Sequence, residues 1–189
     1  MKAVLSLHGF SAAKQLAFAA LFAALCFVGT LVVQIPAPLG GYLNIGDVFV
    51  LLAGWCLGPL YGGIAAAVGS ALADIVAFPI YAPATFLIKG LDAVAAYGLW
   101  LAFKKLFRSE KADMLCRLLS AAAGELIMLI GYALFDYMLS GMGAAVANLP
   151  FNAIQAGLCI IGGCLLVGAL ARLPYVRKLF FHLIEKTER

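Results

Sequence analysis

Six ionisable side chains interrupt long apolar stretches of this 189-residue sequence. On membrane-insertion scales an ionised group in hydrocarbon costs about 2.5 to 3.5 kcal/mol, unless it faces a cavity or a partner. One lysine cannot neutralise five carboxylates, so the acidic excess must hold protons, water or a ligand that donates hydrogen bonds. These residue types therefore indicate non-covalent recognition of a small polar molecule. The six residues are Asp47, Asp74, Lys89, Asp92, Glu125 and Asp136.

Helical spacing predicts that several of these groups share faces with other polar side chains. Glu125, Tyr132 and Asp136 lie at i, i+7 and i+11, and Asn152 and Gln155 lie at i and i+3. We expect these polar faces to converge in the extracellular half of one bundle and to form a pocket there. The expected binding-site residues are Asn44, Asp47, Asp74, Tyr81, Lys89, Tyr132, Asp136, Asn152 and Gln155.

The hypothetical roles follow from side-chain chemistry. Asp74, Asp136 and Asn152 would bond to the edge of the ligand, and Lys89 would pair with an acid or bind an acceptor or phosphate. Tyr42 or Tyr81 would close the top of the pocket. The alternative is that these groups only join helices, for example through an ion pair between Lys89 and either Asp74 or Asp92.

Composition places the elements that carry these residues in a membrane. Hydrophobic residues make up 65% of the chain and charged residues 12%, with a mean hydropathy of +1.06, which leaves too little polar surface for a water-soluble globule. At about 20 residues per span, the chain is long enough for about six helices. We expect an all-α integral membrane bundle of six transmembrane helices that forms a single membrane domain over residues 1–189. The predicted helices are 12–34, 46–58, 60–78, 84–106, 116–138 and 150–172, followed by a basic cytoplasmic tail at 173–189.

Turn residues mark the expected breaks between these helices. Gly58 and Pro59 separate the second helix from the third, and the stretch "SGMGAAVANLP" precedes the last one. Helices are expected to restart at Pro83 and Pro150, where a missing amide hydrogen does little harm.

The distribution of basic residues predicts the orientation. Of the 13 Lys and Arg residues, all except Lys89 lie near the two ends of the chain or around residues 104–117. By the positive-inside rule both termini face the cytoplasm, which requires an even number of spans. We therefore expect a multi-pass protein in a lipid bilayer. The net charge of +4 reports this topology, and we expect no nucleic-acid partner.

Catalytic and metal-binding motifs are absent from the sequence. The two histidines, His8 and His182, lie near the ends, and the chain has no H-x-x-x-H, paired C-x-x-C or G-x-x-x-x-G-K-[ST] motif. The five cysteines are odd in number and mostly mid-span, which favours reduced thiols. We therefore expect no enzyme activity, no cofactor and no metal. Energy for uphill transport would come from ion coupling or from another subunit.

The first predicted helix has a face of small residues. Alanines recur at i, i+4, i+7 and i+11, which leaves a smooth surface where another helix can approach closely. That helix can belong to this chain or to a partner. The four residues are Ala13, Ala17, Ala20 and Ala24.

The chain resembles the substrate-binding membrane subunits, or S components, of energy-coupling factor (ECF) vitamin transporters. The resemblance covers nearly the whole chain, and its longest segment is fairly specific. The matching segments are "AAKQLAFAALFAAL", "PAPLGGYLNIGDVFVLLAGWCLGPLYGGIAAAVGSALAD", "YAPATFLIKGL" and "NLPFNAIQAG".

This resemblance implies a fold and a division of labour. It implies six helices with both termini inside, and a vitamin-sized pocket on the outer side that is capped by the loop between helices one and two. It also implies that the alanine face of the first helix docks onto a transmembrane coupling subunit, which carries two ATPases. ATP turnover would then topple the S component and deliver its ligand inward.

The acidic excess and the amide side chains favour a compact ring that is rich in donors or positively charged. Such ligands are a hydroxymethylpyrimidine, a pyridoxine-like vitamer or a thiamine-like molecule, while riboflavin and folate-like ligands stay possible.

Two other functional classes of protein stay open. One is a stand-alone ion-coupled transporter with Asp92 and Glu125 as a proton relay, although the sequence shows no clear inverted repeat. The other is a membrane scaffold whose buried charges only fix packing.

Overall fold

The computed structural model is a helical bundle, and it describes residues 10–108, 112–176 and 180. Within these residues, five helices are long and apolar enough to cross a membrane. They are α1 (Ala12–Val32), α2 (Asp47–Ala77), α3 (Ala82–Phe107), α4 (Asp113–Ser140) and α5 (Met142–Ala171). The short elements are β1 (Ile35–Pro36), β2 (Tyr42–Leu43), η2 (Pro79–Tyr81) and α6 (Pro174–Val176). The expected membrane bundle is therefore found.

The predicted helices 46–58 and 60–78 both fall within α2, which changes direction at Gly58. Gly58 has φ 80° and ψ −176°, outside the helical region, and Pro59 follows it. A Cβ atom on Gly62 would lie 2.7 Å from the carbonyl carbon of Ala53. In a straight helix these residues would be about 13 Å apart along the axis, so the chain folds back at Gly58. The count of six membrane crossings stays a prediction, as do the cytoplasmic termini.

The predicted loop before the last helix is wrong. The residue between α4 and α5 is Gly141, with φ 83°, and α5 begins at Met142. A glycine at positive φ can reverse the chain direction within one residue. No longer loop is needed between the two helices, so residues 142–149 belong to α5. Pro150 consequently lies inside α5 and does not start it. Pro83, in contrast, lies in the first turn of α3, close to the predicted position.

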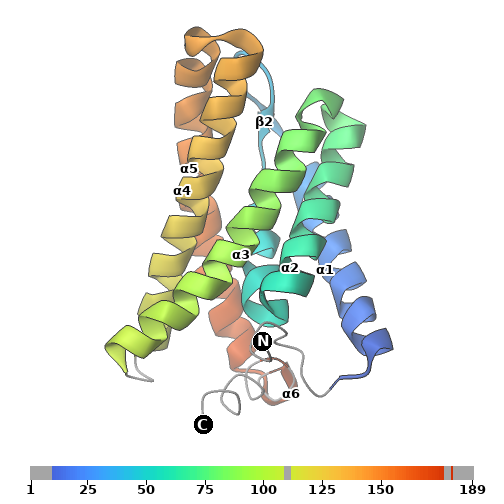
Figure 1. Cartoon of the computed structure of the whole chain (residues 1–189), viewed down its shortest axis with the longest axis vertical. Helices are drawn as coiled ribbons and strands as arrows, with labels where there is room; N and C mark the ends of the chain where they lie inside the picture. The colour runs from blue at the N-terminus through green and yellow to red at the C-terminus, as the bar shows by residue number, and fades with distance from the viewer. Residues whose placement is uncertain (1–9, 109–111, 177–179, 181–189) are drawn as a thin grey trace.

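The helix ends divide the bundle into two ends with different charge. The start of α1, the end of α3, the start of α4 and the end of α5 lie together (Figure 1). We call this the basic end, because it carries Lys14, Lys104, Lys105, Arg108 and Arg172. Most of the predicted tail at 173–189 lies outside the described residues, including its basic residues from Arg177 onward.

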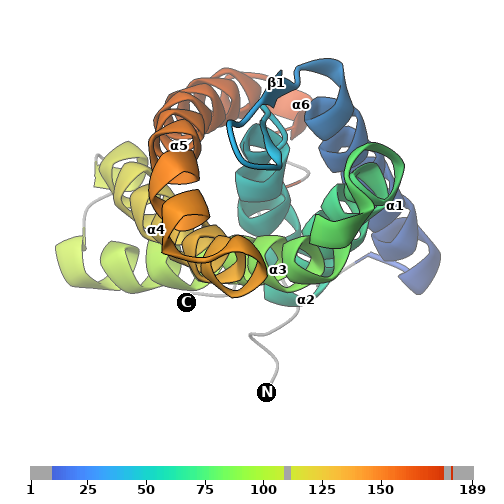
Figure 2. The same cartoon turned by 90° about the horizontal axis from the view of Figure 1, so that it is seen from above.

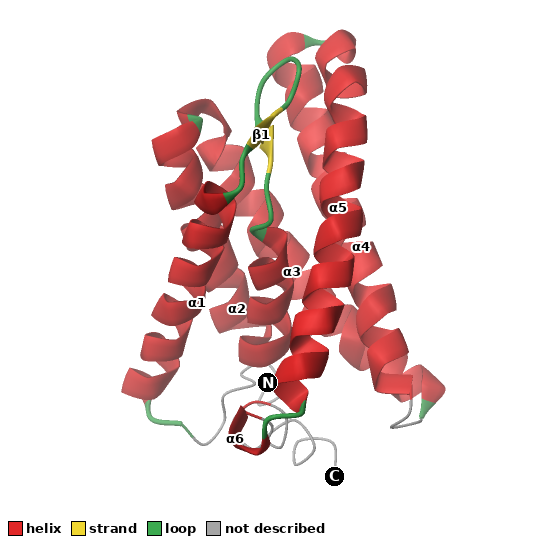
Figure 3. Ribbon diagram, turned by 180° about the vertical axis from the view of Figure 1, so that it is seen from behind, coloured by secondary structure: helices red, strands yellow, loops and turns green. Residues whose placement is uncertain are grey.

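The opposite end, which we call the hairpin end, holds the antiparallel β1–β2 hairpin. Ile35 pairs with Leu43 and Pro36 with Tyr42. Seen from above, the hairpin lies between α1 and α5 and over α2 (Figure 2), and the view from behind shows the same placement (Figure 3). The connection between α1 and α2 therefore covers the interior of the bundle at this end.

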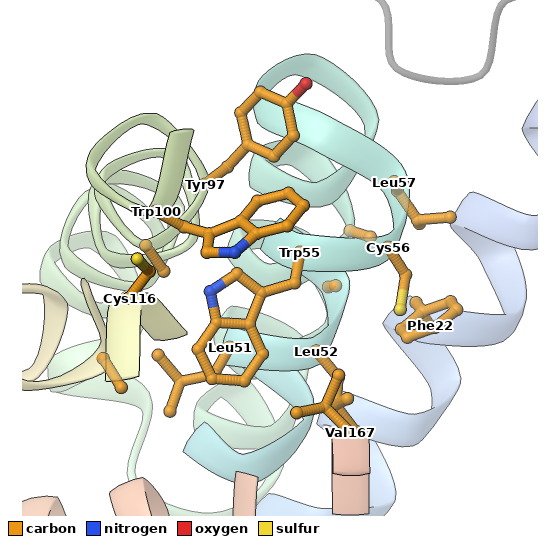
Figure 4. Close-up of a cluster of buried hydrophobic side chains, with 14 residues drawn as sticks. Phe22, Leu51, Leu52, Trp55, Cys56, Leu57, Tyr97, Trp100, Cys116 and Val167 are labelled. Atoms are coloured by element: carbon orange, nitrogen blue, oxygen red, sulfur yellow. The ribbon is translucent and has the colours of Figure 1, made fainter. Parts of the chain in front are cut away.

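An aromatic core fills the bundle toward the basic end. Trp55 and Trp100 are buried at its centre among aliphatic side chains from α2, α3 and α5 (Figure 4). The indole of Trp55 donates a hydrogen bond to Ser120 Oγ at 3.2 Å. The guanidinium of Arg117 lies 4.1 Å from the centre of the Trp100 ring, which is a cation–π distance. Apolar side chains therefore fill the interior toward the basic end, and the buried polar side chains of the cavity lie toward the hairpin end.

We predict that Gly58→Ala destabilises the protein, because φ 80° with ψ −176° is a region that glycine alone adopts readily. The expected loss is about 1 to 3 kcal/mol, read as a lower midpoint of thermal unfolding in detergent. Gly98→Ala is the matched control, since Gly98 lies in α3 and a Cβ there meets nothing within 4 Å. Equal midpoints for Gly58→Ala and the parent protein would contradict the folded-back turn.

Candidate functional site

A cavity lies under the β1–β2 hairpin, between α2, η2, α4 and α5. Its empty space is about 410 Å³ when the open mouth is counted, and the centre of a water molecule can reach about 30 Å³ of it. Polar side chains and loop backbone surround this space closely. The lining residues are Ala37, Gly40, Gly41, Tyr42, Asn44, Asp74, Tyr81, Tyr132, Asp136, Asn148, Asn152 and Gln155.

One side of the cavity is organised around Asp74, near the end of α2. The hydroxyl of Tyr42 donates to Asp74 Oδ1, and the hydroxyl of Thr85 donates to Asp74 Oδ2. Thr85 Oγ1 also lies 2.8 Å from the hydroxyl of Tyr132. This chain of hydrogen bonds joins the hairpin to α2, α3 and α4.

Tyr42 stays a hydrogen-bond donor at neutral pH. It lies in β2, outside the long helices. Burial, together with its hydrogen bond to the Asp74 carboxylate, raises the pKa of the Tyr42 phenol well above its usual range. The hairpin is consequently held to Asp74 by a donor that does not ionise in the physiological range.

The other side of the cavity is organised around Asp136, near the end of α4. Tyr81 donates to Asp136 Oδ1, and Asn148 Nδ2 donates to Asp136 Oδ2 at 3.1 Å. Asn148 also holds the hairpin loop, because it donates to the carbonyl of Gly40 at 3.1 Å and accepts from the amide of Leu39 at 3.3 Å. Asp74 and Asp136 thus anchor the two sides of one cover.

A buried ion pair, which we call the floor, lies behind the lining residues of the cavity. Lys89 Nζ lies 2.5 Å from Asp47 Oδ1, and both side chains are almost fully buried. Gln155 Nε2 donates to Asp47 Oδ2 at 2.6 Å, and the amide of Asn44 donates to Gln155 Oε1 at 2.8 Å. The ammonium of Lys89 also lies 5.1 Å from the centre of the Tyr132 ring. The floor therefore connects α2, α3, α4 and α5.

Most of the residues predicted for the site lie at this cavity. Asp47 and Lys89 do not line it and form its floor instead. The ion-pair partner of Lys89 is Asp47, not the Asp74 or Asp92 considered from sequence. The predicted residues that line the cavity are Asn44, Asp74, Tyr81, Tyr132, Asp136, Asn152 and Gln155.

Sequence reasoning missed Thr85 and the loop backbone at Ala37, Gly40 and Gly41. A signal for Thr85 was available, because Tyr81, Thr85 and Lys89 recur at intervals of four residues and share one helix face. The loop backbone had no such signal, since its position depends on Asn148, which is more than a hundred residues away in the chain.

The side chains that line the cavity can bind a guest mainly through hydrogen bonds. Two carboxylates and four amide side chains offer acceptors and donors, and Tyr132 and Tyr81 offer ring faces. The side chain of Asn152 lines the cavity and has no hydrogen bond to another described residue, so its amide can bond a guest directly. A small polar ring with edge donors and acceptors matches this lining.

The predicted alanine face points away from the bundle. All four of its residues are exposed, whereas Ala19, Phe22 and Cys26 on the opposite face of α1 are buried. The exposed face consists of Ala13, Ala17, Ala20 and Ala24.

Three comparisons relate the chain to known proteins. The family described as "ECF-type riboflavin transporter, S component" matches residues 10–172. An uncharacterized Pyrococcus woesei protein, described by its place in a gap 3′ region, is 39% identical over 139 residues, covering 72% of this chain and 88% of that protein. A solved structure described as the S component of a bacterial ECF transporter has a TM-score of 0.67 and 27% identity, covering 85% of this chain and 97% of that one.

We predict that Lys89→Met strongly destabilises the protein, because it leaves Asp47 buried without its cation. The expected loss is about 3 to 5 kcal/mol, seen as a lower midpoint of thermal unfolding in detergent. The double variant Lys89→Met/Asp47→Asn should recover much of that loss, since no unpaired charge then remains. Additive effects of the two single substitutions would contradict a direct ion pair.

Proposed function

The chain belongs to the family of S components of ECF-type transporters, and on that premise we propose that it captures a vitamin-class heterocycle in the cavity beneath the hairpin. S components are transporter subunits, not enzymes; they bind small-molecule vitamins and work with membrane coupling and ATPase subunits. The observation that carries the proposal is the polar cavity, set in an otherwise apolar bundle. The proposed location is the plasma membrane of a prokaryote, with the cavity facing outward.

Riboflavin is the first candidate ligand, because the matching family is described by it. The chemistry of the lining is compatible with this choice. The imide edge of the flavin ring carries donors and acceptors that the Asn152 amide can match, and Tyr132 offers a ring face. Ribityl hydroxyls can donate to the carboxylates of Asp74 and Asp136. A hydroxymethylpyrimidine, a pyridoxine-like vitamer and a thiamine-like molecule are the alternatives within the same proposal.

Entry of such a ligand requires the hairpin to move. The space that the centre of a water molecule can reach, about 30 Å³, is far below the 300 Å³ or more that is usual for ligand sites. The loop of the hairpin contains Gly40 at φ 115° and Gly41 at φ 74°, which can rotate more freely than other residues. Its anchors, Tyr42 and Asn148, bond through side chains that a ligand can replace.

Delivery inward is proposed to depend on the exposed alanine face of α1. Small side chains let a helix of a coupling subunit approach closely in the membrane. ATP turnover on two ATPase subunits would then topple the S component and release the ligand inside. This chain would supply recognition and a docking surface, while its partners would supply the energy.

We predict that the purified protein binds a member of a vitamin panel without ATP. Calorimetric titration with riboflavin, thiamine, pyridoxine, hydroxymethylpyrimidine and folate should give a saturable signal for one of them. Asn152→Ala should weaken that binding about tenfold or more, equivalent to about 1.4 kcal/mol. Ile154→Ala is the matched control, because Ile154 lies two residues further along α5 and is 55% exposed on the outer surface. Folded protein that gives no heat with any panel member would contradict the proposed function.

We also predict that Ala20→Trp prevents co-purification with the coupling and ATPase subunits, because a large side chain blocks close approach to α1. Vitamin binding by the isolated variant should be unchanged, since Ala20 is exposed and no residue of α1 lines the cavity. Leu165→Trp on the exposed face of α5 serves as a control for a large lipid-facing side chain. Retention of the full complex by Ala20→Trp would place the docking surface elsewhere.

A further inference from the structure

A second cluster of polar groups includes the floor of the cavity. It consists of Asp47, Asp92, Glu125 and Cys159, from α2, α3, α4 and α5, together with Lys89. Each of these residues is at most 2% exposed. The vitamin proposed above needs none of the three acids directly, because none of them lines the cavity.

The charges of this cluster do not balance within it. Lys89 supplies one positive charge, and Asp47, Asp92 and Glu125 supply three negative charges when ionised, so two negative charges are in excess. Uncompensated charge in a low-dielectric interior is costly, because water no longer screens it. A bound divalent cation would cancel that excess as long as the Cys159 thiol keeps its proton. When Cys159 binds as a thiolate, the cluster is neutral if Asp92, which is not one of the three converging donors, carries a proton.

Glu125 gives a separate indication of a ligand. It is 1% exposed, and neither of its carboxylate oxygens has a hydrogen-bond partner among the described residues. One of these oxygens, one oxygen of Asp47 and the sulfur of Cys159 all lie within 4.8 Å of one another. Three donor atoms therefore converge from three helices, and one of the side chains that supply them has no other bonding partner.

We propose that Asp47, Glu125 and Cys159 bind a divalent transition-metal ion of the Zn²⁺ class. Zinc accepts carboxylate oxygen at about 2.0 to 2.2 Å and thiolate sulfur at about 2.3 Å, so a small inward movement of the three donors would suffice. The thiolate favours zinc and cobalt over magnesium and calcium, which prefer oxygen ligands alone. Three protein ligands leave the fourth position of a tetrahedral ion for water.

Metal binding requires the Cys159 thiol to lose its proton. Cys159 Sγ lies 3.7 Å from the carbonyl oxygen of Asn44, to which the thiol donates a weak hydrogen bond. Metal binding breaks the S–H bond, forms a sulfur–metal bond and releases one proton to solvent. Asp47 keeps its ion pair with Lys89, because a carboxylate has about four acceptor positions.

The cavity above provides a route for the ion. Gln155 and Asn44 line the cavity, and they also contact the metal-binding side chains from above. Gln155 donates to Asp47 at 2.6 Å, and the Asn44 carbonyl accepts from Cys159. An ion entering from the hairpin end therefore meets the Gln155 side chain and the Asn44 backbone carbonyl between the cavity and the site.

The test uses the full-length chain in detergent with any affinity tag removed and bound metal stripped by a chelator. The stripped protein is then incubated with Zn²⁺ and desalted, and its Zn²⁺ content should approach one ion per chain, measured by mass spectrometry. Titration with Co²⁺ should produce a thiolate-to-cobalt charge-transfer band. Glu125→Gln should weaken Co²⁺ binding about tenfold or more, and Cys159→Ser should abolish the charge-transfer band.

Cys164→Ser is the matched control, because Cys164 is a thiol on the same helix that is not part of the cluster. Thermal unfolding of each variant verifies that it is folded, and a conservative Glu125→Asp variant should keep part of the affinity if Glu125→Gln alone loses stability. Folded parent protein that retains no Zn²⁺ and shows no Co²⁺ band would overturn the metal site, leaving protonated carboxyls as the explanation. Equal affinity in the parent, Glu125→Gln and Cys159→Ser proteins would also overturn it. Vitamin binding is not measured here, so failure of either proposal leaves the other standing.

Discussion

The buried ammonium of Lys89 is the point on which the interior of this bundle depends. It pairs with Asp47 at the start of α2 and lies over the ring of Tyr132 on α4. Asp47 in turn accepts a hydrogen bond from Gln155 on α5. Because a charge in a low-dielectric interior is tolerated only with close partners, these four helices must keep their relative positions. The ion pair thereby fixes both the floor of the cavity and the geometry of the acids beneath it.

The two halves of the bundle are stabilised by different interactions: apolar packing toward the basic end and hydrogen bonds toward the hairpin end. Toward the basic end, Trp55 and Trp100 pack against aliphatic side chains in a solid core. Toward the hairpin end, polar side chains prevent such packing, because each must find a hydrogen-bond partner. Asp74 and Asp136 find theirs partly on the hairpin side of the cavity, through Tyr42 and Asn148. The cover is thus held by the same carboxylates that line the cavity.

This arrangement suits a subunit that recognises a solute and leaves the energy to its partners. A cover held by side-chain hydrogen bonds can exchange them for bonds to a guest at little net cost, because the number of satisfied groups stays the same. The outer face of α1 is smooth where the alanine residues recur, and it contributes nothing to the cavity lining. The proposed recognition and docking surfaces are therefore separate.

The sequence by itself determined the membrane class, the helical architecture, the separation of basic residues to one end and most of the cavity lining. These properties follow from composition and periodicity, which act locally along the chain. Only the tertiary structure decided that Lys89 pairs with Asp47, that Asn148 holds the hairpin loop, and that Glu125 and Cys159 meet. It also placed the start of α5 at Met142, because a single glycine at positive φ replaced the predicted loop. Partners in an ion pair or a donor cluster come from different helices, and their distances depend on packing that no local pattern of residues encodes.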